Sequence, residues 1–323
     1  MAISLQQNIL AKKAALADAI TEPLASLAQE CSTVWPYADK LDDILYRSIP
    51  DIPNCHLLYA WDVDGIEISS MITRAGADTD WRGRDLSGRP YLKNNLPFKG
   101  IMLSSVYHSI YTNKQCITAL QAVSRDGELL GFIAADFALV DLMADSKLVT
   151  QELHWQQFRG DPAVRGTVFM QQRVQSLLDD HIDELNDQLE TLMVDHGVFH
   201  TKIHYSSGRI SLWLLDDPYN YRIHSVSDIT DQDVCLAYPM HPYPAKAKVS
   251  PEQVRQVLEE FKALRFADET IYLRSASINI MNGMLGLTFS CDGSHYMPVE
   301  EFLDRDISFW LGSLASDNKS SAA

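Results

Sequence analysis

The sequence is short of basic residues and of long apolar runs. Its 323 residues include 43 acidic and 27 basic side chains, which gives a formal net charge of −16. Because such a surface repels phosphate backbones and anionic lipids, we expect neither nucleic acid nor a membrane surface as a partner. No stretch reaches the roughly 18 consecutive apolar residues of a membrane-spanning helix, and the N-terminal segment lacks the apolar core of a signal peptide. These absences predict a cytoplasmic protein.

Cysteines are few and none of them is paired in a C-x-x-C motif. Their number is five, which is odd and argues against a complete disulfide framework. We therefore expect reduced thiols, most of them in the core, at Cys31, Cys55, Cys116, Cys235 and Cys291.

The usual enzyme motifs are absent too. The chain has no G-x-S-x-G elbow, no nucleotide-binding P-loop, no G-x-G-x-x-G after a strand and no H-E-x-x-H. We expect a protein without catalytic activity and without a cofactor. Two alternatives stay open: an enzyme whose active site lies in the second half of the chain, and a dimeric scaffold whose N-terminal pocket is empty.

The composition is that of a folded chain, with 46% hydrophobic and 22% charged residues. A chain of this length exceeds the usual size of one hydrophobic core, so two domains are expected. We predict a first domain over residues 1–150, a second α+β domain over 165–315 and a flexible tail over 316–323.

The first half begins with a helix pattern and continues with strand patterns. Apolar residues at helical spacing predict a helix from residue 3 to the low thirties, kinked or restarted at Pro23 with Thr21 as a cap, and a shorter helix follows at 37–47. Five strands and a closing helix are then predicted, with Asp64-Gly65 as the turn of a first hairpin and a long connection after it. The strands are 56–63, 66–72, 100–109, 116–124 and 129–139, and the helix is 140–149.

The second half predicts a further set of helices and antiparallel strands. A long helix over 167–194 carries a heptad-like apolar seam, which either packs on the protein's own core or joins a homodimer. Its seam residues are Val174, Leu178, Ile182, Leu185, Leu189 and Leu192. The remaining predicted elements are strands at 198–206, 209–216 and 221–226, a helix at 251–265, a hairpin at 270–290 turning at Asn282-Gly283, and a helix at 299–314.

Four short stretches of the first half occur in an order that is typical of one family. They are "DLSGRPYL" (85–92), "SSVYHSIYTNKQCIT" (104–118), "ALQAV" (119–123) and "DGELLGFIAADF" (126–137). Residues 1–145 thereby resemble the PDC sensor domain of the Cache superfamily, a PAS-like ligand-binding module of bacterial chemoreceptors and sensor kinases. The resemblance implies a long helix with a five-stranded antiparallel sheet, a small-molecule ligand and a downstream signalling partner. Such domains usually lie outside the membrane, and in this respect the present chain departs from the family.

In the amino-acid-binding branch of that family an arginine holds the ligand carboxylate and an aspartate at the end of the last strand takes the ammonium group. Arg89 matches the arginine, Tyr107 matches a pocket tyrosine and Asp136 matches the aspartate. The pattern changes at three positions, with Tyr91 for a tryptophan, Leu92 for a tyrosine and Ser109 for an aspartate. The resemblance predicts a ligand site formed by Trp81, Arg89, Tyr91, Ser105, Tyr107, Ser109, Thr118 and Asp136.

Each of these assignments has a structural alternative. A guanidinium is a planar fork that fits a carboxylate, but Arg89 can also pair with Asp85 on the surface. Asp136 can cap the following helix instead of binding a ligand, and the aromatic residues Trp81, Tyr91 and Tyr107 can belong to the core.

Two further clusters are weighed as functional sites. His196, His200 and His204 have the spacing of a zinc site on a helix, but their segment predicts a strand, in which residues four apart are some 13 Å from each other. Ordinary histidines are the expected reading. An acidic flank of the long helix is expected to be a solvated face. Its members are Asp179, Asp180, Asp183, Glu184 and Asp187.

Overall fold

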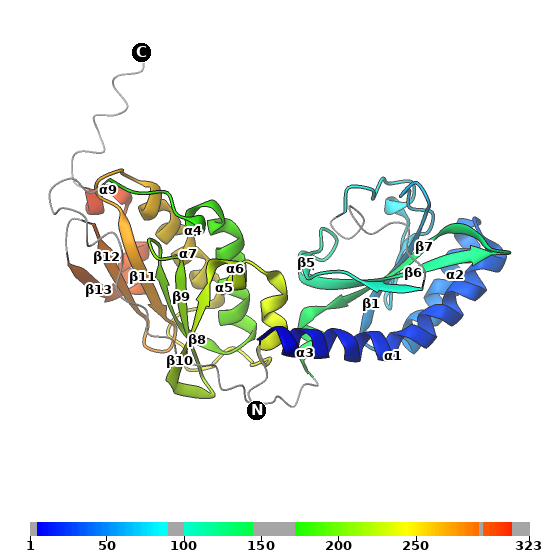
Figure 1. Cartoon of the computed structure of the whole chain (residues 1–323), viewed down its shortest axis with the longest axis horizontal. Helices are drawn as coiled ribbons and strands as arrows, with labels where there is room; N and C mark the ends of the chain where they lie inside the picture. The colour runs from blue at the N-terminus through cyan, green and yellow to red at the C-terminus, as the bar shows by residue number, and fades with distance from the viewer. Residues whose placement is uncertain (1–4, 90–99, 145–171, 291–292, 312–323) are drawn as a thin grey trace, which may run out of the picture. The chain divides into compact units, whose positions relative to one another are not determined.

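The computed structural model describes residues 5–89, 100–144, 172–290 and 293–311 (Figure 1). The chain divides into two compact units, one formed by Ile3–Val149 and the other by Thr150–Ala323 with Met1–Ala2. Both are built from helices and antiparallel sheets, which confirms the predicted α+β class. Of the predicted features, Tyr91, Leu92, Cys291 and the tail 316–323 lie outside the described residues. No helix within the described ranges is both long and apolar enough to span a bilayer.

Helix α1 (Leu5–Val34) runs without interruption through Pro23, so the predicted restart at this residue is wrong. Thr21 does not cap a new helix, because its hydroxyl donates to the carbonyl of Ala17 at 2.6 Å within the same helix. Ile20 and Leu24 on either side of Pro23 are fully buried. Packing of this apolar stripe therefore outweighs the loss of one backbone hydrogen bond at the proline.

The N-terminal unit contains a seven-stranded antiparallel sheet in the order β3-β2-β1-β7-β6-β4, with β5 paired beside β6. Its strands are β1 (Cys55–Asp62), β2 (Met71–Thr73), β3 (Gly76–Asp78), β4 (Ile101–Leu103), β5 (Tyr107–His108), β6 (Gln115–Arg125) and β7 (Glu128–Ala138). The other elements are α2 (Ala38–Ser48), the 3-10 helices η1 (Ile49–Asp51) and η2 (Thr79–Trp81), and α3 (Leu139–Ala144). The sequence predicted five strands.

Serine side chains explain why two predicted strands are broken. Between residues 66 and 70, the amides of Ile68 and Ser69 both donate to the carbonyl of Ala60, and the hydroxyl of Ser69 accepts from the amide of Ala60 at 2.8 Å. The predicted strand 66–72 is thus reduced to β2. In the same way the hydroxyl of Ser104 accepts from the amide of Thr118 at 2.9 Å, and the predicted strand 100–109 separates into β4 and β5.

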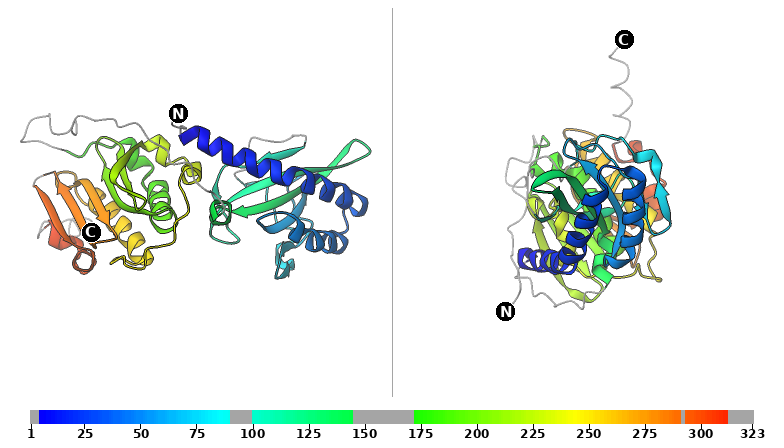
Figure 2. Two further views of the ribbon diagram at one scale, coloured as in Figure 1. Left: turned by 90° about the horizontal axis from the view of Figure 1, so that it is seen from below. Right: turned by 90° about the vertical axis from the view of Figure 1, so that its right-hand side faces the viewer.

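The two faces of this sheet have different coverings. Helix α1 packs along β6, β4 and β7, and Figure 2 shows it lying across one side of the strands. Alternate residues Leu57, Tyr59 and Trp61 of β1 belong to an aromatic cluster against which Trp81 and Tyr111 of the connecting segments pack. Because side chains alternate along a strand, this cluster occupies the sheet face opposite α1.

The C-terminal unit holds a six-stranded antiparallel sheet in the order β10-β9-β8-β11-β12-β13. A helix followed by three strands occurs twice in it, once as α5-β8-β9-β10 and once as α7-β11-β12-β13, and β8 pairs with β11 at the centre. Its helices are α4 (Leu177–Asp180), α5 (Ile182–Asp195), α6 (Val226–Ile229), η4 (Gln232–Ala237), α7 (Pro251–Phe266), α8 (Val299–Leu303) and α9 (Ile307–Leu311). Its strands are β8 (Val198–His204), β9 (Arg209–Leu214), β10 (Asp217–Ser225), β11 (Leu273–Asn279), β12 (Met284–Phe289) and β13 (Ser294–Pro298).

Two helix predictions in this unit are corrected. Residues 172–176 are not helical, because a capping box between Ser176 and Asp179 starts α4 at Leu177, and a break at His181 separates α4 from α5. The predicted terminal helix is likewise divided into α8 and α9, and β13 was not predicted.

The apolar seam of the long helix packs on this unit's own core. Leu178, Ile182, Leu185, Leu189 and Leu192 are all buried, and α5 contacts α7 and β8. Val174, which the sequence placed in the same seam, is 76% exposed.

Candidate functional site

Asp136 lies at the centre of a buried polar network in the N-terminal unit. It is 2% exposed and is paired across the sheet with Thr118, whose hydroxyl donates to Asp136 Oδ1 at 2.7 Å. The hydroxyl oxygens of Tyr107 and Thr118 are 2.6 Å apart. The carboxylate is therefore held by neighbouring strands, and it does not serve as the cap of α3 that the sequence left open.

Two tyrosines complete the surroundings of Asp136. The hydroxyl oxygens of Tyr59 and Tyr107 lie 3.4 Å from Asp136 Oδ1 and Oδ2 respectively. Burial raises the pKa of Asp136 to about 6, against the opposing effects of the Thr118 hydrogen bond and the charge of Arg89. The carboxyl group thus lies in a dry environment that disfavours its charged form.

Arg89 is half-buried, and its charge acts on the carboxylates of both Asp136 and Glu67, whose pKa values it lowers. Asp85 does not take this guanidinium, since its carboxylate accepts from the amide of Ser87 at 2.8 Å. Within the described part of the chain the side chain of Arg89 forms no hydrogen bond or ion pair. The guanidinium of Arg89 therefore acts electrostatically on two acids but forms an ion pair with neither of them.

Glu67 is an acidic group that the sequence analysis missed. Its side chain is 1% exposed, and neither carboxylate oxygen has a hydrogen-bond partner among the described residues. An isolated bridge with Trp61 places it on the face of the aromatic cluster. Burial raises its pKa to about 8, against the opposing charges of Arg84 and Arg89.

The other predicted site residues of this unit differ in their burial and in their hydrogen bonds. Trp81 is half-buried, with its ring centroid 5.5 Å from that of Tyr111. Ser109 is buried, but its hydroxyl accepts from the amides of residues 111 and 112 and so serves the turn after β5. Ser105 is exposed, and Ser104 occupies the buried position next to Thr118. Tyr91 lies outside the described residues.

His196, His200 and His204 are divided between the end of a helix and a strand. His200 and His204 belong to β8, as the strand reading predicted, while His196 ends α5 with its Nδ1 3.2 Å from the carbonyl of Pro239. In the described ranges no three His, Cys, Asp or Glu side chains are grouped in a way that could hold a metal ion.

Several residues of the acidic flank form ion pairs with α7 and are not simply exposed to solvent. Asp179 is buried in a bidentate pair with Arg265, at 2.7 and 2.8 Å. Asp183 pairs with Lys262, and Asp187 pairs with Arg255. The flank therefore connects α4 and α5 to α7.

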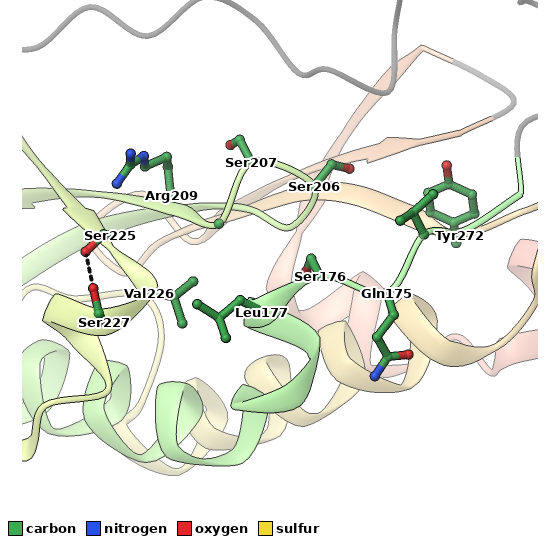
Figure 3. A pocket seen from close by; sticks show the side chains of 12 residues that line it. Gln175, Ser176, Leu177, Ser206, Ser207, Arg209, Ser225, Val226, Ser227 and Tyr272 are labelled. Atoms are coloured by element: carbon green, nitrogen blue, oxygen red, sulfur yellow. Dashed lines mark hydrogen bonds between the residues drawn. The ribbon is translucent and has the colours of Figure 1, made fainter. Parts of the chain in front are cut away.

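A second feature is a cavity of about 600 Å³ in the C-terminal unit (Figure 3). Serine hydroxyls dominate its polar lining, together with Arg209 and Tyr272. Ser176 and Ser225 are already used as helix caps, and the Ser225 hydroxyl lies 2.9 Å from that of Ser227. Sequence reasoning placed no site here, and hydroxyls engaged in capping give no sign of a specific ligand.

Comparison with known proteins gives limited similarity. No family model and no curated protein matches the chain. The ligand-binding domain of the Campylobacter jejuni chemoreceptor Tlp3, in complex with 4-methylisoleucine, matches 43% of this chain and 57% of its own at 16% identity, with a TM-score of 0.36. The ligand-binding domain of the Pseudomonas fluorescens chemoreceptor CtaA, in complex with L-valine, matches 38% of this chain and 53% of its own at 20% identity, with a TM-score of 0.31.

A third match is an extracellular ligand binding receptor from Desulfohalobium retbaense, which covers 43% of this chain and 25% of its own at 16% identity, with a TM-score of 0.36. The chain thus spans little more than half of the chemoreceptor domains that it matches. Similarity at this level assigns neither a family nor a ligand to this chain.

Proposed function

We propose that the N-terminal unit binds a small zwitterionic metabolite of the amino-acid type and that the protein is a sensor without catalytic activity. The observation that carries this proposal is a buried carboxylate, Asp136, together with Arg89, a half-buried cation whose charge acts on it and whose side chain has no partner among the described residues. A buried carboxylate is unfavourable unless a positive group compensates it, and a ligand ammonium is such a group.

In this proposal Arg89 binds the ligand carboxylate and Asp136 binds the ammonium group. A guanidinium offers two parallel donors to a carboxylate, which fixes its orientation. Thr118 and Tyr107 hold the Asp136 side chain in place, so little freedom is lost when the ligand binds. The sequence resemblance to PDC sensor domains supports the same roles for Arg89 and Asp136.

A sensor must bind its ligand better in one of two states, and the signal is the shift between them. We propose a downstream protein as the receiver of that signal and the cytoplasm as the place where it acts. A homodimer is also part of the proposal, but its interface would use a surface other than the seam of α5, which this chain's own core covers.

Isothermal titration calorimetry of the full-length protein against the common amino acids tests the proposal. We expect at least one to bind, and Arg89→Ala and Asp136→Asn each to weaken binding at least about tenfold, the effect of a lost charged hydrogen bond. Arg74→Ala is the matched control, because Arg74 is exposed on the β2–β3 turn. Absence of binding, or equal binding by all variants, would contradict the proposal.

A further inference from the structure

Glu67 is a buried acid whose carboxylate has no partner among the described residues. Its carboxylate oxygens lack hydrogen bonds within the described part of the chain, while its backbone is fixed by Arg84 and Gly83, at 2.9 and 2.7 Å. Buried acids are normally paired or hydrogen-bonded. A rigidly held, buried carboxyl group without a hydrogen-bond partner among the described residues is a candidate site for a cation from outside.

Two arginines, Arg84 and Arg89, and two acids, Asp42 and Asp78, act electrostatically on Glu67. The guanidinium of Arg84 donates to the carbonyl of Asp80 at 3.1 Å and lies 4.1 Å from the ring centroid of Trp81. Asp42 is bound by Arg82 at 2.6 Å, and Asp78 accepts from the amide of Asp80 at 3.1 Å. Arg84 and Arg89 lower the pKa of Glu67 through their charge, but within the described residues neither forms a hydrogen bond or ion pair with its carboxylate.

The position of Glu67 relates it to Asp136. On β1, Leu57 is the partner of Asp136 and Trp61 is the partner of Glu67. Four residues along a strand span about 13 Å, so the two acids are attached at opposite ends of the same row of cluster side chains. Arg89 influences both of them electrostatically.

We propose that Glu67 binds a second cationic group of the ligand, so that the preferred ligand is an amino acid with a basic side chain. The inference rests on the proposed function: Asp136 takes the α-ammonium group, Arg89 takes the α-carboxylate, and Glu67 takes the cation at the end of the side chain. Two acids and one arginine match a ligand with two positive groups and one negative group.

The protonation of Glu67 gives a distinctive readout. With a pKa of about 8, the carboxyl group is mainly protonated at pH 7 before the ligand binds. A cation placed beside it favours the ionised form, so binding of a basic amino acid releases a proton. A neutral amino acid of the same length leaves the proton in place.

The experiment compares L-lysine with L-norleucine, which has the same carbon chain without the terminal amine. Calorimetry of the full-length protein at pH 7 in two buffers of different ionisation enthalpy gives both affinity and proton release. We expect lysine to bind at least about tenfold more tightly than norleucine, with proton release only for lysine. Glu67→Gln removes the preference and the proton release and leaves norleucine binding unchanged.

The controls separate this inference from the proposed function. Glu67→Gln keeps the side-chain shape and replaces a mainly protonated carboxyl group by a neutral amide, so the fold is retained. Glu128→Gln, on an exposed glutamate of β7, is the matched control. If norleucine binds as well as lysine and Glu67→Gln changes neither, the Glu67 site is wrong while the proposed function stands. If neither amino acid binds to the wild type, the Glu67 inference is overturned, while the proposed function is decided separately by the titrations against the other common amino acids.

Discussion

Arg82 and Asp42 form an ion pair that connects the loop after β3 to helix α2. The guanidinium donates to Asp42 Oδ2 at 2.6 Å, and Asp42 Oδ1 accepts from the amide of Ser70 at 2.8 Å. The Nε of Arg82 also donates to the hydroxyl of Ser70 at 3.0 Å. The segment that carries Glu67 and Trp81 is thereby attached to α2, and a ligand that moves this segment has a physical connection to the helices on the other face.

Removal of Asp42 is expected to destabilise the protein. Asp42→Ala leaves the amide of Ser70 and the guanidinium of Arg82 without their partner, at a cost of about 1–3 kcal/mol of unfolding free energy. Urea denaturation measures the change. Arg47→Ala breaks the exposed pair with Glu30 and should change stability by less than about 1 kcal/mol. Equal effects of the two variants would contradict the structural role of the Asp42 pair.

The raised pKa of Asp136 predicts a pH dependence of stability. Since the folded protein holds this proton more tightly than the unfolded chain, the contribution of Asp136 to stability is largest below pH 3.8 and falls as the pH rises to about 6. The total change is about 3 kcal/mol. Urea titrations between pH 4 and 7 should show that Asp136→Asn is more stable than the wild type at pH 7, with the difference lost at pH 4. A constant difference would exclude the shifted pKa.

Ligand affinity should rise with pH, whereas the contribution of Asp136 to stability falls. A ligand ammonium requires the ionised form of Asp136, so affinity for a neutral amino acid is expected to rise about tenfold per pH unit below its pKa of about 6 and to level off above it. Calorimetric titrations between pH 5 and 7.5 test this. In Asp136→Asn the weakened affinity should no longer change with pH over this range.

The buried pair of Arg265 and Asp179 predicts acid sensitivity in the C-terminal unit. Burial by itself raises the pKa of Asp179, but the hydrogen bonds from Arg265 and Ser176 outweigh it and lower the pKa below its usual value. The stabilisation is therefore present above the unfolded pKa of about 4 and is lost as the pH falls through the folded pKa.

Asp179→Asn should cost about 3–5 kcal/mol, because it leaves a buried guanidinium between Tyr205 and Tyr272 without its counter-ion. Urea denaturation at pH 7 measures the loss. Asp180→Asn, on an exposed neighbour of the same helix, is the control and should have little effect.

Gly131 on β7 is expected to tolerate no side chain. A Cβ at this position would lie 2.3 Å from the carbonyl oxygen of Trp61 and 2.5 Å from the ring of Trp35, so Gly131→Ala should lower stability by at least about 1–3 kcal/mol. Gly293→Ala, where a Cβ would meet open space, provides the comparison in thermal denaturation. A wild-type melting temperature for Gly131→Ala would contradict the close approach.

Local patterns predicted the elements well where the chain follows its own periodicity. The long N-terminal helix and the strands β6 and β7 follow from apolar spacing alone, and Asp136 was recognised because it matches the aspartate that ends the last strand in the family that residues 1–145 resemble. Glu67 escaped notice because it alternates with apolar residues as a solvent-facing strand residue would. Glu67 is buried because the connecting segments pack over the sheet face that carries the aromatic cluster, and a local sequence pattern does not predict such packing.

The sequence analysis named Ser105 as a site residue, whereas Ser104 holds the buried position, and this error also arises from what a local pattern cannot show. Adjacent strand residues point to opposite faces, so the choice between two neighbouring serines depends on register, which is set here by the hydrogen bonds between Ser104 and Thr118. Pro23 shows the reverse case, in which a strong local signal for a break is overruled by packing of the helix on the sheet.

The repeated order of one helix and three strands in the C-terminal unit has a consequence for how its chain can be cut. The two repeats meet along the β8–β11 ladder and the contact of α5 with α7, and residues 238–250 connect them. Each repeat keeps its own hairpins if that connection is opened. Two separately expressed fragments divided there should therefore recombine into the six-stranded sheet, with the central ladder acting as the interface of a noncovalent heterodimer.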